Sequence, residues 1–198
     1  AHTVKVDAAG LASGTTYYYR FQAMGRISPV GRTRTAGTGN VASMRLGVVA
    51  CSNYARGYFA AYRELAATPD LDAIVHLGDY FYEGGDSDVR THDPKHELLE
   101  LGHYRTRYRQ YRRDPDLAEA HRQHPFIAVW DDHEIANNAW KNGASNHTAG
   151  KGPWETRKAD AVRAWHEWMP VREAADEHIW RSFGFGSLLD IVMLDTRI

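Results

Sequence analysis

Two kinds of hydrophobic pattern divide the chain, and the longer part begins after residue 43. Four short runs there consist almost wholly of apolar residues, which is typical of strands buried on both faces. Three longer stretches repeat apolar residues at three- and four-residue steps, as helices with one buried face do. The predicted strands are 44–50, 73–77, 126–130 and 191–194, and the predicted helices are 58–67, 97–112 and 155–169. Alternating strands and helices predict an α/β fold in which helices cover a largely buried sheet.

Residues 1–36 follow a different pattern of short alternating runs with turn residues between them. Thr3-Val4-Lys5-Val6 alternates, and strands are also expected at 15–23 and 27–35. The stretch from Leu11 to Tyr19 resembles the tyrosine corner of fibronectin III-like sandwiches, in which a Tyr hydrogen-bonds back to the preceding turn. We therefore expect the last strands of such a β-sandwich, with a free-standing hairpin as the alternative. Residues 37–43 are then a linker of small and polar residues.

Charge and composition narrow the range of partners. The 198 residues contain 24 Lys and Arg against 25 Asp and Glu, a formal net charge of −1. Without a basic excess, neither duplex nucleic acid nor an anionic membrane is expected as the main partner. No apolar run approaches the ~20 residues of a membrane helix, and no leader opens the chain, which we expect to begin inside a longer protein. A single cysteine, Cys51, excludes an internal disulfide framework.

Reactive side chains follow three of the four predicted strands. Ligands of open α/β sheets gather beyond the carboxyl ends of the strands. At these ends the sequence reads Cys51-Ser52-Asn53, Gly78-Asp79-Tyr80-Phe81-Tyr82 and Asp131-Asp132-His133-Glu134. The fourth strand is followed by Asp195-Thr196-Arg197, for which a structural Asp–Arg pair and a role in a site are both open. Carboxylates, a thiol, a phenol and an imidazole are thus delivered to one edge, as a polynuclear metal site requires.

These motifs resemble those of calcineurin-like phosphoesterases, in which Gly-Asp after one strand is followed by Gly-Asn-His-Glu or Gly-Asn-His-Asp after another. Here Asp131-Asp132-His133-Glu134 replaces the second motif, with Asp132 at the position of the Asn. This replacement, with the aromatic run after Asp79, is similar to the alkaline phosphatase D (PhoD-like) family of that superfamily. Further landmarks in matching order extend the resemblance over nearly the whole chain: Tyr104-Arg105-X-Arg107-Tyr108, Asp114-Pro115-Asp116-Leu117, Met169-Pro170-Val171-Arg172 and Leu194-Asp195-Thr196-Arg197.

The resemblance implies a metallophosphoesterase-like sheet in residues 44–198, as the N-terminal half of a catalytic domain. It also implies a hydrolase of phosphate mono- or diesters that binds Fe(III) and Ca(II). The iron ligands of the family fall on Cys51, Asp79 and Tyr82, and this set is coherent because thiolate and phenolate are strong donors to Fe(III).

The remaining implied roles concern calcium and the reaction. Asp79 would bridge the two metals, and Asp132 would serve calcium with Asn137, or its neighbour Asn138, as a further oxygen ligand. A metal-bound hydroxide would attack phosphorus while His133 assists the leaving oxygen. The family resemblance further implies a secreted or periplasmic protein.

Other polar residues are expected at the surface. The histidines in polar helix or loop contexts are His92, His96, His103, His121 and His124. The arginines expected to be solvated or ion-paired are Arg105, Arg107, Arg109, Arg112 and Arg113.

Two alternatives stay open. A cysteine phosphatase uses Cys-X5-Arg, but only four residues separate Cys51 from Arg56, and this interpretation leaves Asp79 and Asp132 unexplained. The second alternative is a catalytically incomplete fragment that acts as a structural or binding piece of a longer phosphatase. It is favoured by the absence of any His-X-His sequence, because the superfamily carries Gly-His-X-His among its later ligands.

Overall fold

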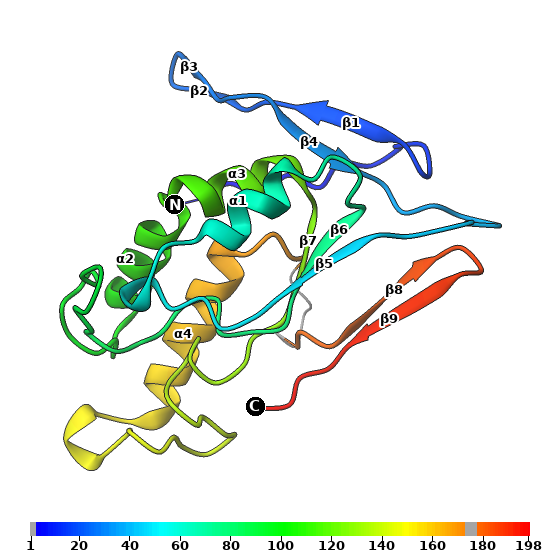
Figure 1. Ribbon diagram of the computed structural model, residues 1–198. Helices are drawn as coiled ribbons and strands as arrows, with labels where there is room; N and C mark the ends of the chain where they lie inside the picture. Colours follow the sequence, from blue (N-terminus) through cyan, green and yellow to red (C-terminus); the bar gives the residue numbers. More distant parts are fainter. Residues whose placement is uncertain (1–2, 173–177) are drawn as a thin grey trace.

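The computed structural model describes residues 3–172 and 178–198, and a three-stranded parallel sheet lies at its centre (Figure 1). The sheet contains β5 (Leu46–Val49), β6 (Ala73–His76) and β7 (Phe126–Ala128), in the order β5-β6-β7. Helix α1 (Ala60–Ala67) connects β5 to β6, and α2 (Leu101–Arg112) and α3 (Pro115–Gln123) stand between β6 and β7 in the chain. Parallel neighbours need such crossovers, so the predicted mixed α/β organisation is confirmed here.

Burial differs between the strands of this sheet. All four residues of β6 are buried, because the strand has a neighbour on each side. In β5, by contrast, Val48 is 60 % exposed. The expectation that residues 44–50 form a strand buried on both faces is therefore wrong. The strand is shorter, and among the described residues it pairs on one side only. The apolar run predicted that a strand forms but not its place in the sheet.

The helices bury aromatic side chains against the sheet and against one another. Tyr104, Tyr108 and Tyr111 of α2 are fully buried, as their three- and four-residue spacing predicts. Helix α4 (Trp154–Trp168) packs on α2 and buries Trp165, and Met169 follows as its C-cap. Together with β6 and β7 these residues form the hydrophobic core.

Helix α3 was not assigned from the sequence, although its N-terminal signals are clear. The Asp114 side chain accepts hydrogen bonds from the N–H groups of Asp116 and Leu117, and Pro115 occupies the first helical turn. Two short 3-10 helices, η1 (Tyr54–Arg56) and η2 (Ala149–Lys151), complete the helical elements of the described residues.

The strand expected at 191–194 forms, but outside the parallel sheet. Strands β8 (Arg181–Phe185) and β9 (Leu189–Met193) make a separate antiparallel hairpin. Gly186, with φ of +57°, allows the tight turn between them. The prediction of a fourth strand in the main sheet is therefore wrong, because the preceding segment offers β9 a local partner.

The N-terminal section is β-structured, with one exception. Strand β1 (Thr16–Tyr19) pairs antiparallel with β4 (Gly31–Arg34), and β2 (Gln22–Ala23) pairs with β3 (Arg26–Ile27). The segment expected as a strand at 3–6 is not one, and Thr3 Oγ1 instead donates to the carbonyl of Glu167 near the end of α4. Tyr17 Oη accepts a hydrogen bond from Ala12 N at 2.8 Å, the bond that a tyrosine corner requires. The sandwich itself stays a prediction, and residues 1–2 lie outside the described part.

Some polar residues expected at the surface are buried. His92 is fully buried, with its ring nitrogens facing Gly84 O at 2.9 Å and Tyr111 Oη at 3.2 Å. His124 is almost fully buried, and its Nε2 lies 3.0 Å from Leu65 O. The surface prediction is wrong for both. Tertiary partners lie within hydrogen-bond distance of both ring nitrogens of His92 and of Nε2 of His124.

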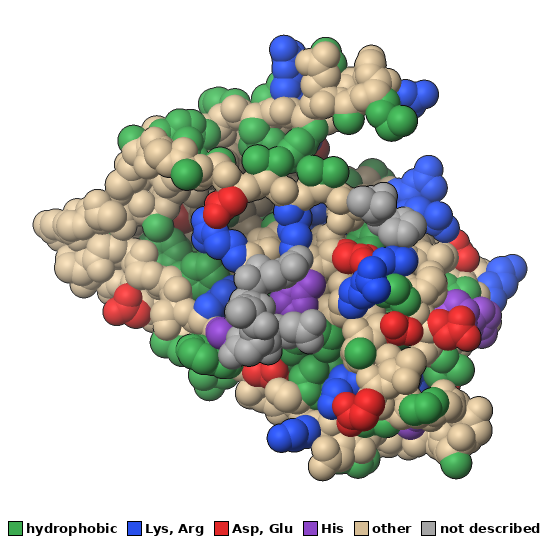
Figure 2. Space-filling view, turned by 180° about the vertical axis from the view of Figure 1, so that it is seen from behind, with side chains coloured by type: hydrophobic (Ala, Val, Ile, Leu, Met, Phe, Trp, Pro, Cys, Tyr) green, Lys and Arg blue, Asp and Glu red, His purple; other side chains and the backbone are tan. Residues whose placement is uncertain are grey.

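The surface agrees with the balanced composition. The face opposite to that of Figure 1 mixes acidic and basic side chains among polar and apolar ones (Figure 2). Among the residues that the structure describes, no helix is long and apolar enough to cross a bilayer.

The buried His76 of β6 should make stability depend on pH. Burial lowers the pKa of His76 to about 3, so below about pH 6.5 the unfolded chain binds a proton that the folded chain does not. Its contribution to stability is thus present above pH 6.5 and is lost as the pH falls. Urea unfolding of His76→Gln between pH 6.5 and 4.5 should show a slope shallower than wild type by up to about 1.4 kcal/mol per pH unit. Equal slopes would contradict this account.

Candidate metal centre

The carboxyl ends of β5, β6 and β7 bring the three reactive segments together. Cys51 N donates to Gly78 O at 3.2 Å, and Ser52 N donates to Asp79 O at 2.8 Å, which ties the ends of β5 and β6. A Cβ on Gly78 would lie 2.5 Å from the backbone N of Asp131, so only glycine lets the ends of β6 and β7 approach this closely. Cys51 and Asp79 both have positive φ, +57° and +53°, a strained conformation that is found at functional sites.

Two predicted ligands, Cys51 and Tyr82, both contact one carboxylate oxygen of a third, Asp79. Asp79 Oδ2 lies 3.5 Å from Cys51 Sγ and accepts a hydrogen bond from Tyr82 Oη at 3.2 Å. Desolvation and neighbouring negative charge raise the pKa of each of these three groups, although Cys51 as a residue is exposed. Without a cation Cys51 and Tyr82 therefore keep their protons at neutral pH, and a bound metal would displace them. This donor set fits a metal ion.

The second group of predicted residues faces the same carboxylate. His133 N donates to Asp79 Oδ1 at 3.3 Å, and His133 Nε2 lies 3.7 Å from Asp132 Oδ2. Ligand atoms of Asp79, Asp132 and His133 lie within 4.8 Å of one another. Asn138, with φ of +51°, donates its N–H to Asp132 Oδ2 at 2.6 Å. Asn137 instead donates its N–H to Glu83 Oε1, so the choice between the two asparagines as ligands stays open.

The His133 ring is held by Glu83, a residue to which sequence analysis gave no role. Glu83 Oε2 lies 2.6 Å from His133 Nδ1, while Oε1 accepts hydrogen bonds from Asn137 N and Asn146 Nδ2. Burial opposes the charge on His133, but Glu83, Asp79 and Asp132 outweigh it and raise the pKa to about 9. The only signal in the sequence was the position of Glu83 directly after Tyr82.

Glu134 supports the backbone beneath the site. Its buried carboxylate accepts hydrogen bonds from the N–H groups of Asp79, Tyr80 and Asp131, at 3.1, 2.5 and 2.9 Å. Burial raises the pKa of Glu134 to about 8, against the effect of these N–H bonds. Glu134 thus connects the segments after β6 and β7 through their backbone N–H groups.

Arg197 reaches the site from beyond β9. Its Nε donates to Asp131 Oδ1 at 2.5 Å and its Nη2 donates to Asp132 Oδ1 at 3.1 Å. Asp195 Oδ1 instead accepts hydrogen bonds from Trp130 Nε1 and from the backbone N–H of Arg197. Arg197 thus forms Asp–Arg pairs with Asp131 and the predicted ligand Asp132, and its role in a site stays a prediction.

The geometry weakens the cysteine phosphatase interpretation. Arg56 is exposed and forms an ion pair with Asp88 at 2.9 Å rather than facing the thiol. The raised pKa of Cys51 is also the opposite of what a nucleophilic thiolate needs.

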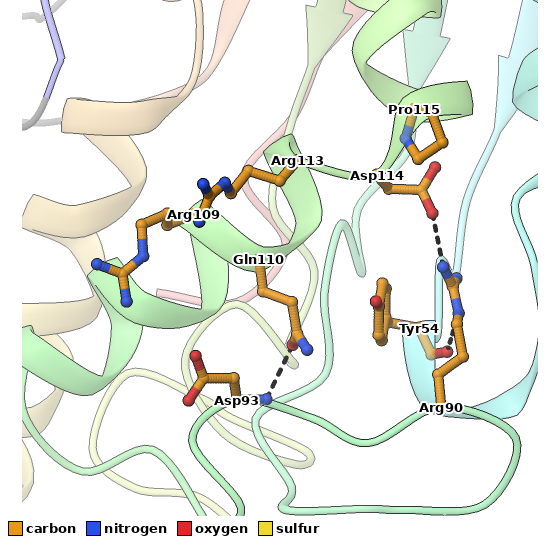
Figure 3. Close-up of a pocket in the computed structure, with 8 residues that line it drawn as sticks. All are labelled: Tyr54, Arg90, Asp93, Arg109, Gln110, Arg113, Asp114 and Pro115. Carbon is orange, nitrogen blue, oxygen red and sulfur yellow. Dashed lines mark hydrogen bonds and ion pairs between the residues drawn. The ribbon is translucent and has the colours of Figure 1, made fainter.

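The arginines on and near α2 have different surroundings. A hollow of about 270 Å³ near the end of α2 is lined by Arg90, Arg109 and Arg113 (Figure 3). There Arg90 forms an ion pair with Asp114 at 2.6 Å, while the side chains of Arg109 and Arg113 point away from this pair (Figure 3). Arg105 is ion-paired with Glu167, as expected.

Arg107 is the exception on this helix. It is fully buried and has backbone carbonyls as partners, so the expectation that it is solvated or ion-paired is wrong.

A parallel sheet whose strand ends present an Asp, a thiol, a phenol and an Asp-His pair defines a metallophosphoesterase-like protein. The structure of a purple acid phosphatase from yellow lupin (Lupinus luteus) seeds shares the fold, with a TM-score of 0.57 at 14% identity over 89% of this chain and 29% of that one. The family model for PhoD-like phosphatase matches residues 46–198, and the model for the N-terminal domain of PhoD-like phosphatases matches residues 1–37. The chain belongs to the PhoD-like phosphatase family.

Individual relatives agree with this assignment. Alkaline phosphatase D of Bacillus subtilis (strain 168) is 38% identical over 211 residues, which cover 100% of this chain and 36% of the relative. A solved structure of PhoD superposes with a TM-score of 0.89 at 37% identity, covering 97% of this chain and 39% of that one. The chain thus spans well under half the length of these relatives.

Replacement of Glu134 tests its role beneath the site. Glu134→Gln keeps the shape but turns an amide N–H₂ toward backbone donors, so we expect the free energy of unfolding to fall by about 1–3 kcal/mol. Chemical denaturation at pH 9.5, above the pKa of Glu134, measures this, with Glu119→Gln of the Glu119–Arg122 surface pair as the matched control. A Glu134→Gln protein as stable as the control would contradict the structural role.

Proposed function

We propose that the protein containing this chain is a metal-dependent phosphoric ester hydrolase of the alkaline phosphatase/phosphodiesterase type, with Fe(III) and Ca(II) as cofactors. The observation that carries the proposal is the shared Asp79 carboxylate, with Oδ2 facing Cys51 and Tyr82 and Oδ1 facing His133. Membership of the PhoD-like phosphatase family supports the same activity.

Cys51, Asp79 and Tyr82 would hold the ferric ion, and Asp132 with Asn137 or Asn138 would hold calcium beside Asp79. The soft thiolate and the phenolate suit iron, and the carboxylate and amide oxygens suit calcium. When bound, such a metal pair activates water for attack on phosphorus and neutralises charge on the phosphoryl oxygens.

His133 would act on the leaving oxygen of the ester. Glu83 accepts a hydrogen bond from His133 Nδ1–H, which fixes the ring and leaves Nε2 on the side of Asp132. The hydrogen bond and charge of Glu83 favour the protonated imidazole, which can donate the Nε2 proton to the departing alkoxide. Arg197 would reduce the negative charge of Asp131 and Asp132 where an anionic substrate approaches.

The substrate is a phosphate monoester or diester, since both classes meet the same chemistry. Secretion or a periplasmic location is proposed from the family resemblance, and fractionation of producing cells would test it. The alternative function is a catalytically incomplete piece of a longer phosphatase, which is favoured by the 36% coverage of the Bacillus relative. Full phosphatase activity in a species of 22.4 kDa mass would refute that alternative.

Loss of one iron ligand should remove both metal and activity. In the full-length protein, Tyr82→Phe should abolish the visible ligand-to-metal charge-transfer band of a Tyr–Fe(III) site, and Asp79→Asn and Cys51→Ser should lower bound iron. Elemental analysis, visible spectra and hydrolysis of p-nitrophenyl phosphate measure these effects. The proposal fails if the Cys51 or Asp79 variant keeps both wild-type metal content and wild-type rate.

Replacement of His133 should separate catalysis from metal binding. His133→Asn should keep iron and calcium but lower kcat by about 10²–10⁴, because the leaving oxygen loses its proton donor. The loss should be largest for esters with poor leaving groups, for which protonation matters most. An equal loss for p-nitrophenyl and alkyl phosphates would contradict the proton-donor role.

A further inference from the structure

We propose that Arg107 of α2 is a positioning residue for the candidate metal centre, which holds the backbone at Tyr82 so that the Tyr82 phenol and the Glu83 carboxylate face the site. The inference rests on the proposed function and adds to it a residue that acts through the main chain from beneath the site.

The contacts of Arg107 carry the inference. Its side chain is fully buried, and the guanidinium donates from Nε to Asp93 O at 3.1 Å, from Nη2 to Pro94 O at 2.9 Å and from Nη1 to Tyr82 O. Within the described residues these partners are all backbone carbonyls, and Arg107 forms no ion pair with a carboxylate. Burial lowers the pKa of Arg107 only to about 10, so the group stays charged at neutral pH.

The three hydrogen bonds close the loop between β6 and α2. They join Tyr82, where the loop leaves the metal-site segment, to Asp93 and Pro94 near its return. Two further bonds brace the same loop, from Leu98 N to Glu83 O at 3.0 Å and between His92 Nδ1 and Gly84 O at 2.9 Å. The Arg107 guanidinium thus joins the two ends of the loop directly, and these further bonds hold it elsewhere.

Tyr82, whose carbonyl Arg107 binds, and the adjacent Glu83 both contact residues of the candidate metal centre. Tyr82 Oη reaches Asp79 Oδ2 at 3.2 Å, and Glu83 Oε2 reaches His133 Nδ1 at 2.6 Å. A displacement of the Tyr82 carbonyl would therefore move a predicted iron ligand and the partner of the predicted proton donor together.

The place of Arg107 on its helix points the same way. It lies on the buried face of α2 with Tyr104, Tyr108 and Tyr111, where an apolar residue would satisfy both helix propensity and packing. A buried guanidinium is unfavourable unless its donors are bound, and its planar fork fits several carbonyls at once, which a Lys ammonium does not.

The test compares Arg107→Lys and Arg107→Met with Arg109→Met in the full-length protein. Arg109 is exposed on the same helix and serves as the matched control. The measurements are ferric iron affinity by chelator competition, charge-transfer absorbance per bound iron, and circular dichroism to establish folding. We expect Arg107→Met to weaken iron binding by about 10–100-fold and to lower the absorbance per iron, with Arg107→Lys intermediate and Arg109→Met unchanged.

A purely structural role would give a different result. Lower stability with wild-type affinity and wild-type absorbance per iron in folded Arg107 variants would overturn the inference. If Arg107→Met does not fold, Arg107→Lys decides. If wild-type protein binds no coloured iron, the proposed Tyr82 ligation fails by itself. Hydrogen exchange of residues 78–98 then tests Arg107: faster exchange in Arg107→Lys than in Arg109→Met supports positioning, and equal exchange overturns it.

Discussion

The close approach of the ends of β6 and β7 is the constraint on which the site depends. At Gly78 any side chain would collide with the backbone of Asp131, so the two strands can end side by side only with glycine there. That contact places Asp79 next to the Asp131–Glu134 segment, and the hydrogen bonds from Cys51 and Ser52 add the end of β5. The candidate ligands therefore meet because three backbones turn within one small volume, at positions where Cys51 and Asp79 adopt positive φ.

Concentrating carboxylates in this way has an electrostatic cost that the neighbouring groups offset. Backbone N–H groups serve Asp132, Glu83 and Glu134, and Arg197 lies against Asp131 and Asp132. Asp79 and Glu83 differ in this respect, because burial and the charge of Asp132 raise the pKa of Asp79, whereas the hydrogen bond and charge of His133 lower the pKa of Glu83. A cation beside Asp79 would offset the unfavourable burial of its charge.

The sequence predicted the parts of this arrangement that depend on local order. Apolar runs indicated β6 and β7, and the spacing of tyrosines indicated α2. The motifs after the strands predicted that five side chains would lie close together: Cys51, Asp79, Tyr82, Asp132 and His133. It did not predict partners brought together by the tertiary fold. Glu83 and Glu134 act on segments about 50 residues away, with sequence separations of 50 for Glu83–His133 and 55 for Glu134–Asp79. Likewise, the polar sequence context of His92 and Arg107 predicted that both side chains would be exposed to water. In the structure both are buried and contact backbone carbonyls of the loop between β6 and α2.

The raised pKa of the Cys51 thiol has a consequence for the protein before any metal binds. Cys51 is the single cysteine of the chain and is exposed, which would ordinarily make it a target for peroxide and for mixed disulfides. Oxidants and disulfides react with the thiolate, and desolvation together with the charge of Asp79 keeps the sulfur protonated at neutral pH. The Asp79 carboxylate therefore also slows oxidation of the Cys51 sulfur while the candidate site holds no metal.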